Sequence, residues 1–364
     1  MHGSGRNAAA WPQADRRSGS GRASGVARLL FAICLCVGSF AATCGADDAD
    51  GPATVAAPQH SAGYRRSTLT YTGETQGQQV RRIDIWYPTA AAEEPYDYRP
   101  QLGSVAPDAQ PSPGRHPLIL FSHGFLGASD QSIYLMERWA RAGYIVAAID
   151  HADAIKGRNS GPIKMRPFIF ADRWSANTCA DRREDLSALL TFLLAENVTA
   201  GSPWLDAIDP DRIGGCGHSL GGYTMLGLVG GWRDWTEPRI KAVVLWSPFL
   251  QPYRSRGEAA EVTVPVQFQG GTLDWGITPH LQPVYDQLKC TRTLLMLEGA
   301  THLEWTNLVS IRQSTRDAVA AGNPELIARY TIAFFDQHLC GADCSAVLEA
   351  AKPQLHLYRT DGAE

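Results

Sequence analysis

The sequence lacks the features that mark several large classes of protein. Its 364 residues carry a net charge of only −4, and the basic residues form no long block, so a nucleic-acid partner is not expected. An internal repeat is absent, which excludes a repeat architecture. No pair of cysteine or histidine residues has the two-residue spacing of a zinc site, so a metal site is not expected. An organic cofactor is not expected either. What is present is enough apolar sequence, 44%, to bury a sizeable core.

The N-terminal region does not resemble the rest of the chain. Residues 1–28 are rich in Gly, Ser, Ala and Arg without an apolar period, and we expect them to be disordered. Residues 29–46 are uncharged and mostly apolar, follow several arginines and precede a polar stretch, which is typical of a secretory signal peptide. The pattern therefore predicts an exported protein, periplasmic or secreted. A membrane anchor through this segment, or a lipid on Cys44 in "AATC", remains the alternative.

Export changes how the cysteines are interpreted, because disulfides form in oxidising compartments. The pair in "CGADC", Cys340 and Cys344, has the closest spacing beyond the signal segment, and we expect a local bridge there. Five cysteines follow Cys44, so at least one stays free or pairs between chains. Cys216 lies in a predicted buried strand and is the best candidate for a free thiol.

Residues 65–340 read as one α/β domain, preceded by a linker (47–64) and followed by a C-terminal tail (341–364). Two strands of alternating polarity, 67–73 and 80–89, should pair antiparallel at one edge. Apolar strands then alternate with amphipathic helices, which predicts a mostly parallel sheet with helices on both faces. The expected strands are 117–124, 144–150, 212–219, 240–248, 264–271 and 292–300, and the expected helices are 132–144, 179–196, 220–231, 281–289 and 323–339.

One connection is unusually long. Residues 151–178 separate the strand that ends at Asp150 from the next helix, and they carry Phe168, Phe170 and Trp174. Long loops in compact domains are usually lids or binding loops, and this one follows the carboxyl end of a strand, where open α/β sheets bind ligands. We therefore expect a short lid-like insertion here.

The segment "GHSLG" (217–221) matches the nucleophile-elbow pattern G-x-S-x-G between a predicted strand and a predicted helix. A sharp turn there strains the serine backbone and leaves no room for side chains two residues to either side. The pattern predicts Ser219 as a nucleophile. The residue order of such sites then requires an acid and a histidine further along the chain.

Strand ends supply both partners. His302 directly follows a predicted core strand, and Asp274 follows the strand before it. Glu298 is the alternative acid. The oxyanion of a tetrahedral intermediate needs backbone donors, which we expect at the N–H groups of Leu220 and Phe125. Aromatic residues near the strand ends predict an apolar or aromatic substrate; these candidate substrate-binding residues are Trp246, Phe249, Trp275 and Trp305, with core packing as the alternative.

These residues carry a resemblance. The stretches "IDIWYPT", "HPLILFSHGFLG", "RAGYIVAAIDHAD", "DPDRIGGCGHSLGGYTML" and "EGATH" resemble α/β-hydrolases of the group that includes platelet-activating-factor acetylhydrolases, dienelactone-hydrolase-like proteins and secreted polyester hydrolases. The resemblance spans residues 65–340. It implies the α/β-hydrolase fold and a serine esterase; dienelactone hydrolases use a cysteine nucleophile, so Ser219 argues against that activity.

The sequence thus predicts a secreted hydrolase that cleaves carboxylic esters, of small molecules, lipids or polyesters, through an acyl-enzyme on Ser219. An acyltransferase on the same fold and a non-catalytic binding protein are the alternatives. The membrane would be contacted only through the signal segment or a lipid on Cys44, and the sequence does not indicate an oligomeric state.

Overall fold

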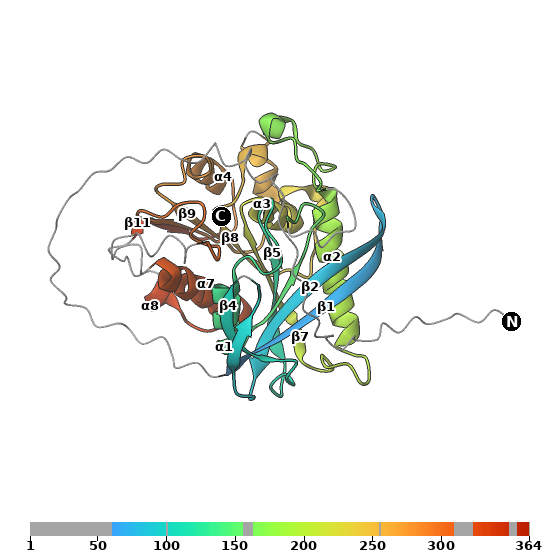
Figure 1. Ribbon diagram of the computed structural model, residues 1–364. Coiled ribbons are helices and arrows are strands. Elements are labelled where there is room, and N and C mark those ends of the chain that lie inside the picture. Colours follow the sequence, from blue (N-terminus) through green and yellow to red (C-terminus); the bar gives the residue numbers. More distant parts are fainter. Residues whose placement is uncertain are drawn as a thin grey trace. The chain divides into compact units, whose positions relative to one another are not determined.

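The computed structural model describes residues 60–99, 101–155, 163–254, 256–308, 323–348 and 355–363. The expected signal peptide, Cys44 and residues 47–59 of the expected linker lie outside these ranges. Within them the chain forms one sheet of eleven strands in the order β11-β10-β9-β8-β7-β5-β6-β2-β1-β4-β3, with helices packed on it (Figure 1).

The middle of the sheet is parallel. It consists of β5 (His116–Ser122), β6 (Ile145–Ile149), β7 (Ile208–His218), β8 (Ala242–Trp246), β9 (Val266–Gly271) and β10 (Arg292–Leu297), each paired in parallel with its neighbour. Every residue of β5, β6, β8, β9 and β10 is buried, as expected for strands covered on both faces. The predicted mostly parallel sheet is therefore confirmed.

The N-terminal edge extends further than predicted. Strands β1 (Ser61–Gly73) and β2 (Gly77–Thr89) do pair antiparallel, and β2 continues the sheet from β6. The prediction that this pair forms the edge is wrong, because β4 (Leu102–Pro107) and β3 (Glu94–Asp97) add a hairpin beyond β1. The hairpin forms within the Pro-rich connection because Val105 and Tyr98 are buried in the core beside Trp86. Strand β1 also begins inside the stretch expected to be linker.

Helices cover both faces of the sheet. Crossovers from β5 to β6 and from β6 to β7 run in opposite directions along the strand order, so α1 (Ile133–Arg141) and α2 (Ala180–Glu196) lie on opposite faces. Helix α7 (Asn323–Cys340) shares the face of α1, and their apolar side chains form one core cluster with alternate strand residues. Figure 1 shows α1 and α7 together, with α2 on the far side of the strands.

The shorter helices differ from their predicted lengths. Helix α3 (Leu220–Leu226) ends early and continues as a π turn, within which Gly230 adopts a non-helical φ of 120°. Helix α4 (Leu281–Tyr285) covers only the first part of residues 281–289. The remaining short elements are α8 (Ser345–Leu348), the π turn η3 (Gly227–Gly231), and the 3-10 turns η2 (Phe168–Arg173), η4 (Arg233–Trp235), η5 (Gln251–Tyr253), η6 (Glu258–Glu261) and η7 (Thr278–His280).

The expected C-terminal tail is part of the fold. Residues Leu355–Asp361 form β11, which pairs antiparallel with β10 and closes that edge of the sheet. The interpretation of this segment as a tail is wrong. The segment is short and only partly buried, so its own apolar pattern does not indicate a strand, and the strand is formed by pairing with β10.

The expected disulfide does not form. All five described cysteines are free thiols, Cys340 and Cys344 included. The two sulfurs have different surroundings: Cys340 Sγ lies 3.8 Å from the Tyr144 hydroxyl at the end of α7, whereas Cys344 packs against the core. Cys216 is fully buried in β7, and burial raises the pKa of its thiol well above the ordinary value.

Among the described helices, none combines the length and the apolar character needed to cross a membrane.

Candidate active site

Ser219 stands at the turn between β7 and α3. Its φ of 54° is left-handed, a strained backbone for a residue with a side chain. Neighbouring glycines make the turn possible: a Cβ on Gly217 would lie 2.2 Å from the Gly221 carbonyl oxygen, and one on Gly221 would lie 1.9 Å from that of Ser122. The crowding expected from the sequence is therefore present on both sides of the serine.

The three side chains predicted as a triad are in hydrogen-bond contact. His302 Nε2 lies 2.9 Å from Ser219 Oγ, and His302 Nδ1 lies 2.7 Å from Asp274 Oδ2. Since a carboxylate only accepts, Nδ1 carries the proton and Nε2 is free to accept from the serine hydroxyl. Asp274 is 6% exposed and His302 33%, so the acid is sheltered while the histidine reaches solvent.

The alternative acid is elsewhere. Glu298 is 49% exposed, and its carboxylate accepts from Thr272 Oγ1 at 3.1 Å and faces His356 Nδ1 at 2.9 Å. It contacts the edge strand β11 rather than the imidazole of His302. The structure therefore brings Asp274, and not Glu298, to the histidine.

Ser247 is a site residue that sequence reasoning missed. It follows β8 directly, has a φ of 41°, and is fully buried. Its hydroxyl donates to Asp274 Oδ2 and lies 3.0 Å from His302 Nδ1. A serine at the carboxyl end of a buried parallel strand was the available signal, since such strand ends share one edge of the sheet.

His218 contacts the backbone of His302. Its Nε2 donates to the His302 carbonyl oxygen at 2.9 Å, and the two rings lie 4.8 Å apart. Burial, and then the neighbouring His302, lower the pKa of His218 well below its ordinary value, so the ring is neutral. This contact fixes the backbone that carries His302.

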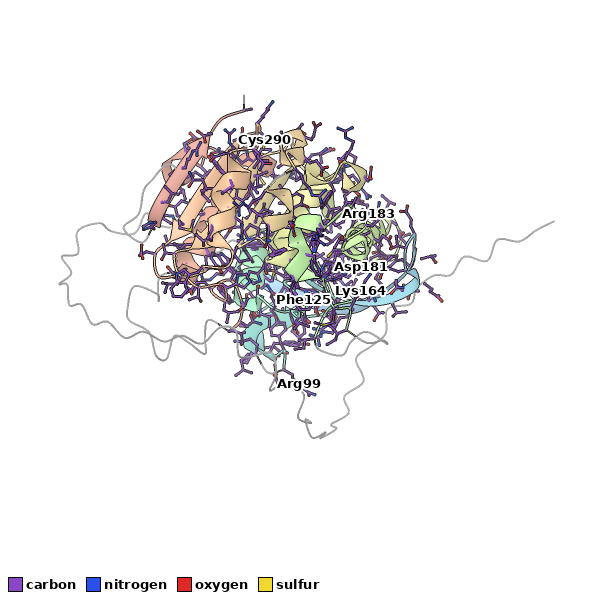
Figure 2. The ribbon with its side chains drawn as sticks, turned by 90° about the horizontal axis from the view of Figure 1, so that it is seen from above. Arg99, Phe125, Lys164, Asp181, Arg183 and Cys290 are labelled. Carbon is purple, nitrogen blue, oxygen red and sulfur yellow. The ribbon has the colours of Figure 1, made fainter. Side chains whose placement is uncertain are left out.

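The two expected oxyanion donors lie in different segments, one of which directly follows the serine. Leu220 is the first residue of α3, and Phe125 lies in the loop after β5 (Figure 2). Within the described part of the chain, no protein acceptor takes a hydrogen bond from the Phe125 N–H. Gly124 brings this loop close to the elbow, because a Cβ there would lie 2.9 Å from His218 Nδ1.

Residues of the segment predicted as a lid contact this loop through aromatic rings. Phe168 in η2 lies 5.0 Å from Phe125 and 5.2 Å from Phe249, measured between ring centroids. The buried Trp174 lies 5.3 Å from Phe249. Phe249 also donates its backbone N–H to the Ser219 carbonyl oxygen at 2.9 Å. Phe249, predicted to bind substrate, thus shares an aromatic cluster with Phe125.

The predicted tryptophans divide into two groups. Trp246 and Trp305 are fully buried, and the interpretation as substrate-binding residues is wrong for both. Trp246 packs against Trp139 at 5.1 Å in the α1 face of the core, and Trp305 donates to Gln269 Oε1 at 3.1 Å. Trp275 next to Asp274 is 71% exposed, so it alone of the three can contact a ligand.

No metal site accompanies these groups: among the described residues, no three His, Cys, Asp or Glu side chains are grouped to hold an ion. The site itself presents a strained serine, an oriented imidazole and a buried carboxylate. This arrangement can deprotonate a hydroxyl and use it as a nucleophile.

Known proteins match this chain in sequence and in fold. A model of the PET hydrolase-like family matches residues 172–341. Cutinase 1 of Thermobifida cellulosilytica is 27% identical over 188 residues, which are 50% of this chain and 59% of that protein. Cutinase est1 of Thermobifida alba is also 27% identical, over 50% of this chain and 52% of its own length. The match thus spans little more than half of these curated relatives.

A solved structure extends the likeness over most of the chain. The ferulic acid esterase of Streptomyces cinnamoneus superposes with a TM-score of 0.59 at 22% identity, covering 83% of this chain and 95% of that one. At this identity the likeness concerns the fold. Together with the elbow after a parallel strand and the helices on both faces, it shows that the chain has the α/β-hydrolase fold.

Proposed function

We propose that the protein is a carboxylic ester hydrolase that works through an acyl-enzyme on Ser219. The observation that carries this proposal is the hydrogen-bonded series Ser219–His302–Asp274, with distances of 2.9 and 2.7 Å, at the carboxyl ends of the parallel strands. Cutinases and a PET hydrolase-like family among the similar proteins support the same reaction class.

Each group has a role in the two half-reactions. Ser219 Oγ attacks the ester carbonyl carbon while His302 Nε2 takes its proton, and Asp274 stabilises the imidazolium. The N–H groups of Phe125 and Leu220 bind the oxyanion. His302 then gives its proton to the leaving alkoxide, which departs as an alcohol. Water, deprotonated by the same imidazole, attacks the carbonyl carbon of the acyl-enzyme. The imidazolium then returns this proton to Ser219 Oγ as the acid is released, and the reaction requires no cofactor.

The substrate is an apolar ester, and an aromatic or aliphatic polyester fits the site best. The rings of Phe125, Phe168 and Phe249 gather beside the proposed oxyanion donors. Around them, the lid and the loop after β9 leave large apolar side chains uncovered, which suits an extended hydrophobic substrate. These exposed residues are Met165, Ile169, Phe170, Leu273 and Trp275.

A polyester substrate also requires that the protein be exported. A polyester is too large to enter a cell, and the uncharged segment 29–46 behind a basic region supplies a signal for secretion.

Hydrolysis of p-nitrophenyl butyrate and release of soluble acids from a polyester film, each by the purified mature protein and by Ser219→Ala, test the proposal. We expect turnover of both substrates by the wild type and loss of at least about 10⁴-fold in the variant. Equal rates in the two proteins would overturn the serine mechanism. Turnover of the soluble ester without release from the film would restrict the substrate to small esters.

A further inference from the structure

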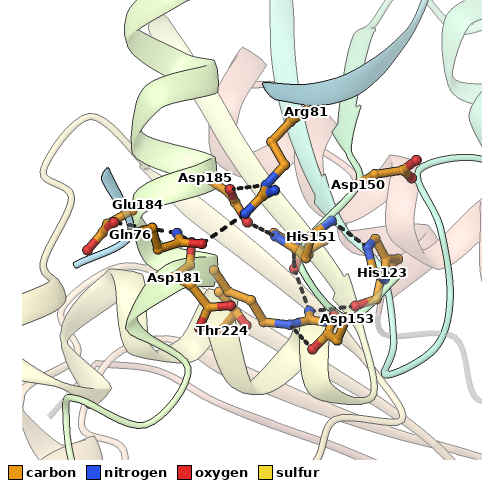
Figure 3. A network of polar contacts seen from close by, with 12 residues as sticks. Gln76, Arg81, His123, Asp150, His151, Asp153, Asp181, Glu184, Asp185 and Thr224 are labelled. Carbon is orange, nitrogen blue, oxygen red and sulfur yellow. Dashed lines mark hydrogen bonds and ion pairs between the residues drawn. The ribbon is translucent and has the colours of Figure 1, made fainter. Parts of the chain in front are cut away.

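The loop that carries Phe125 rests on a buried ionic cluster outside the triad. Arg182, in the first turn of α2, is fully buried and lies beneath this loop. Figure 3 shows His123, His151, Asp153 and Asp185 converging in the same network of polar contacts. A charged side chain with no exposure needs partners, and those of Arg182 show what it holds.

Two groups of partners surround the guanidinium. On the loop side, Arg182 Nη1 donates to the His123 carbonyl oxygen at 2.7 Å, and Nη2 donates to that of Gly124 at 3.3 Å. On the other side, Asp153 accepts from Nη2 at 2.7 Å and from Nε at 3.1 Å. Burial by itself would raise the pKa of Asp153, but the neighbouring Arg182, and then Arg166, lower it below its ordinary value. Asp153 therefore remains a carboxylate and fixes the cation against the loop.

The Gly124 carbonyl oxygen receives further donors. His123 Nδ1 lies 2.7 Å from it, and the Gly127 N–H donates to it at 3.0 Å. His123 Nε2 accepts from the His151 N–H at 2.9 Å, so the ring is neutral with its proton on Nδ1. Burial, the largest cause, lowers the pKa of His123 well below its ordinary value, consistent with this form. Among the residues that the structure describes, Arg182 is the one charged donor on this carbonyl.

The direction of this carbonyl determines the direction of the next amide. In a trans peptide the C=O of residue i and the N–H of residue i+1 lie in one plane and point in opposite directions. With the Gly124 oxygen drawn inward to Arg182, the Phe125 N–H must point outward, away from the ionic cluster. The adjacent positive charge also polarises the peptide and strengthens this N–H as a donor.

We propose that Arg182 is a positioning residue for the oxyanion hole: it orients and polarises the Gly124–Phe125 peptide so that the Phe125 N–H meets the developing oxyanion. This inference rests on the proposed ester hydrolysis. It extends the site to α2, because a guanidinium that never touches the substrate determines how well a backbone donor stabilises the transition state.

The test compares Arg182→Met with Arg81→Met as a matched control. Arg81 is also buried and ion-paired, but its guanidinium binds Asp185 at 2.9 Å and Gln76 at 2.8 Å instead of the loop. We measure kcat and KM for p-nitrophenyl butyrate, and Ki for a trifluoromethyl ketone, which adds to a serine hydroxyl as a tetrahedral oxyanion. Removing one oxyanion donor typically lowers kcat by about 10²–10³-fold.

We expect Arg182→Met to lower kcat by at least about tenfold at nearly constant KM, and to weaken the Ki of the ketone by a similar factor. Arg182→Lys keeps the positive charge but loses the planar guanidinium with its several N–H donors, and it should recover part of kcat and part of the affinity for the ketone. Arg81→Met should leave kcat and Ki within about threefold of wild type. Values for a folded Arg182→Met that match those of Arg81→Met would overturn the inference.

A second variant and a second readout keep the test decisive. If Arg182→Met does not fold, Arg182→Met combined with Asp153→Asn removes both charges of the pair and is measured in its place. A crystal structure of the folded variant shows the peptide directly. A Gly124–Phe125 peptide that rotates or becomes disordered supports the role of Arg182, and one that keeps its orientation overturns it. This readout holds even if the wild type hydrolyses no ester, a result that would refute the proposed function alone.

Discussion

Replacing Asp274 by Asn tests the acid of the proposed triad. The substitution keeps the shape of the side chain but removes the charge that faces His302 Nδ1 at 2.7 Å. Asp274 is nearly buried, so an effective dielectric near 20 applies, and a unit charge pair about 4 Å apart then contributes about 4 kcal/mol. That energy is gained only when the imidazole is protonated, which happens in the transition state.

An energy of about 4 kcal/mol corresponds to about 10³-fold in rate, and loss of the correct tautomer adds to it. We therefore expect Asp274→Asn to lower kcat for p-nitrophenyl butyrate by about 10³–10⁴-fold, with little change in KM. The assay is release of p-nitrophenolate at pH 7.5, with the thermal midpoint recorded for each variant.

Glu298→Gln is the matched control, because Glu298 is the other carboxylate near a strand end and faces His356 instead of His302. It should retain wild-type kcat. Activity of Asp274→Asn within tenfold of wild type, or loss of activity in Glu298→Gln, would refute the assignment of the acid.

Two further outcomes follow from the structure. Burial raises the pKa of Asp150 to about 6, so this carboxyl stabilises the fold at low pH and loses that contribution as the pH rises through 6. The free energy of unfolding of Asp150→Asn minus that of the wild type, both measured with urea, should therefore rise by about 2 kcal/mol between pH 4 and pH 8. A difference that stays constant with pH would contradict the burial argument. Phe168→Ala removes the ring that packs on Phe125 and Phe249. It should raise KM for aromatic esters about fivefold, while KM for p-nitrophenyl acetate changes less. Equal changes in KM for both substrates would show that Phe168 does not belong to the substrate site.

The sequence located those parts of the site that depend on strand ends and local crowding. Ser219 could be named because its glycines are required by contacts within a few residues, and Asp274 and His302 because each follows a core strand. The parallel sheet brings such ends to one edge, and in the structure the three side chains are in contact.

Other parts depend on tertiary packing: a local pattern can place a residue at a strand end, but it does not give the side chain's partner. Ser247 contacts Asp274 only because β8 and β9 are neighbours with a particular register, and Arg182 reaches the Gly124 carbonyl from a helix 58 residues further along the chain. Trp246 was misassigned for a related reason: it stands near a strand end, but its side chain points to the α1 face of the core. Position along a strand does not determine which neighbour a side chain meets.

Covalent labelling tests the central claim most directly. The purified mature protein is treated with a p-nitrophenyl alkylphosphonate, and the adduct is counted by intact mass and located by peptide mapping, with Ser219→Ala treated in parallel. The account predicts one adduct per chain, on Ser219, with ester turnover lost in proportion to labelling and no adduct in the variant. Absence of an adduct, an adduct on another serine such as the buried Ser122, or turnover that survives complete labelling would contradict it.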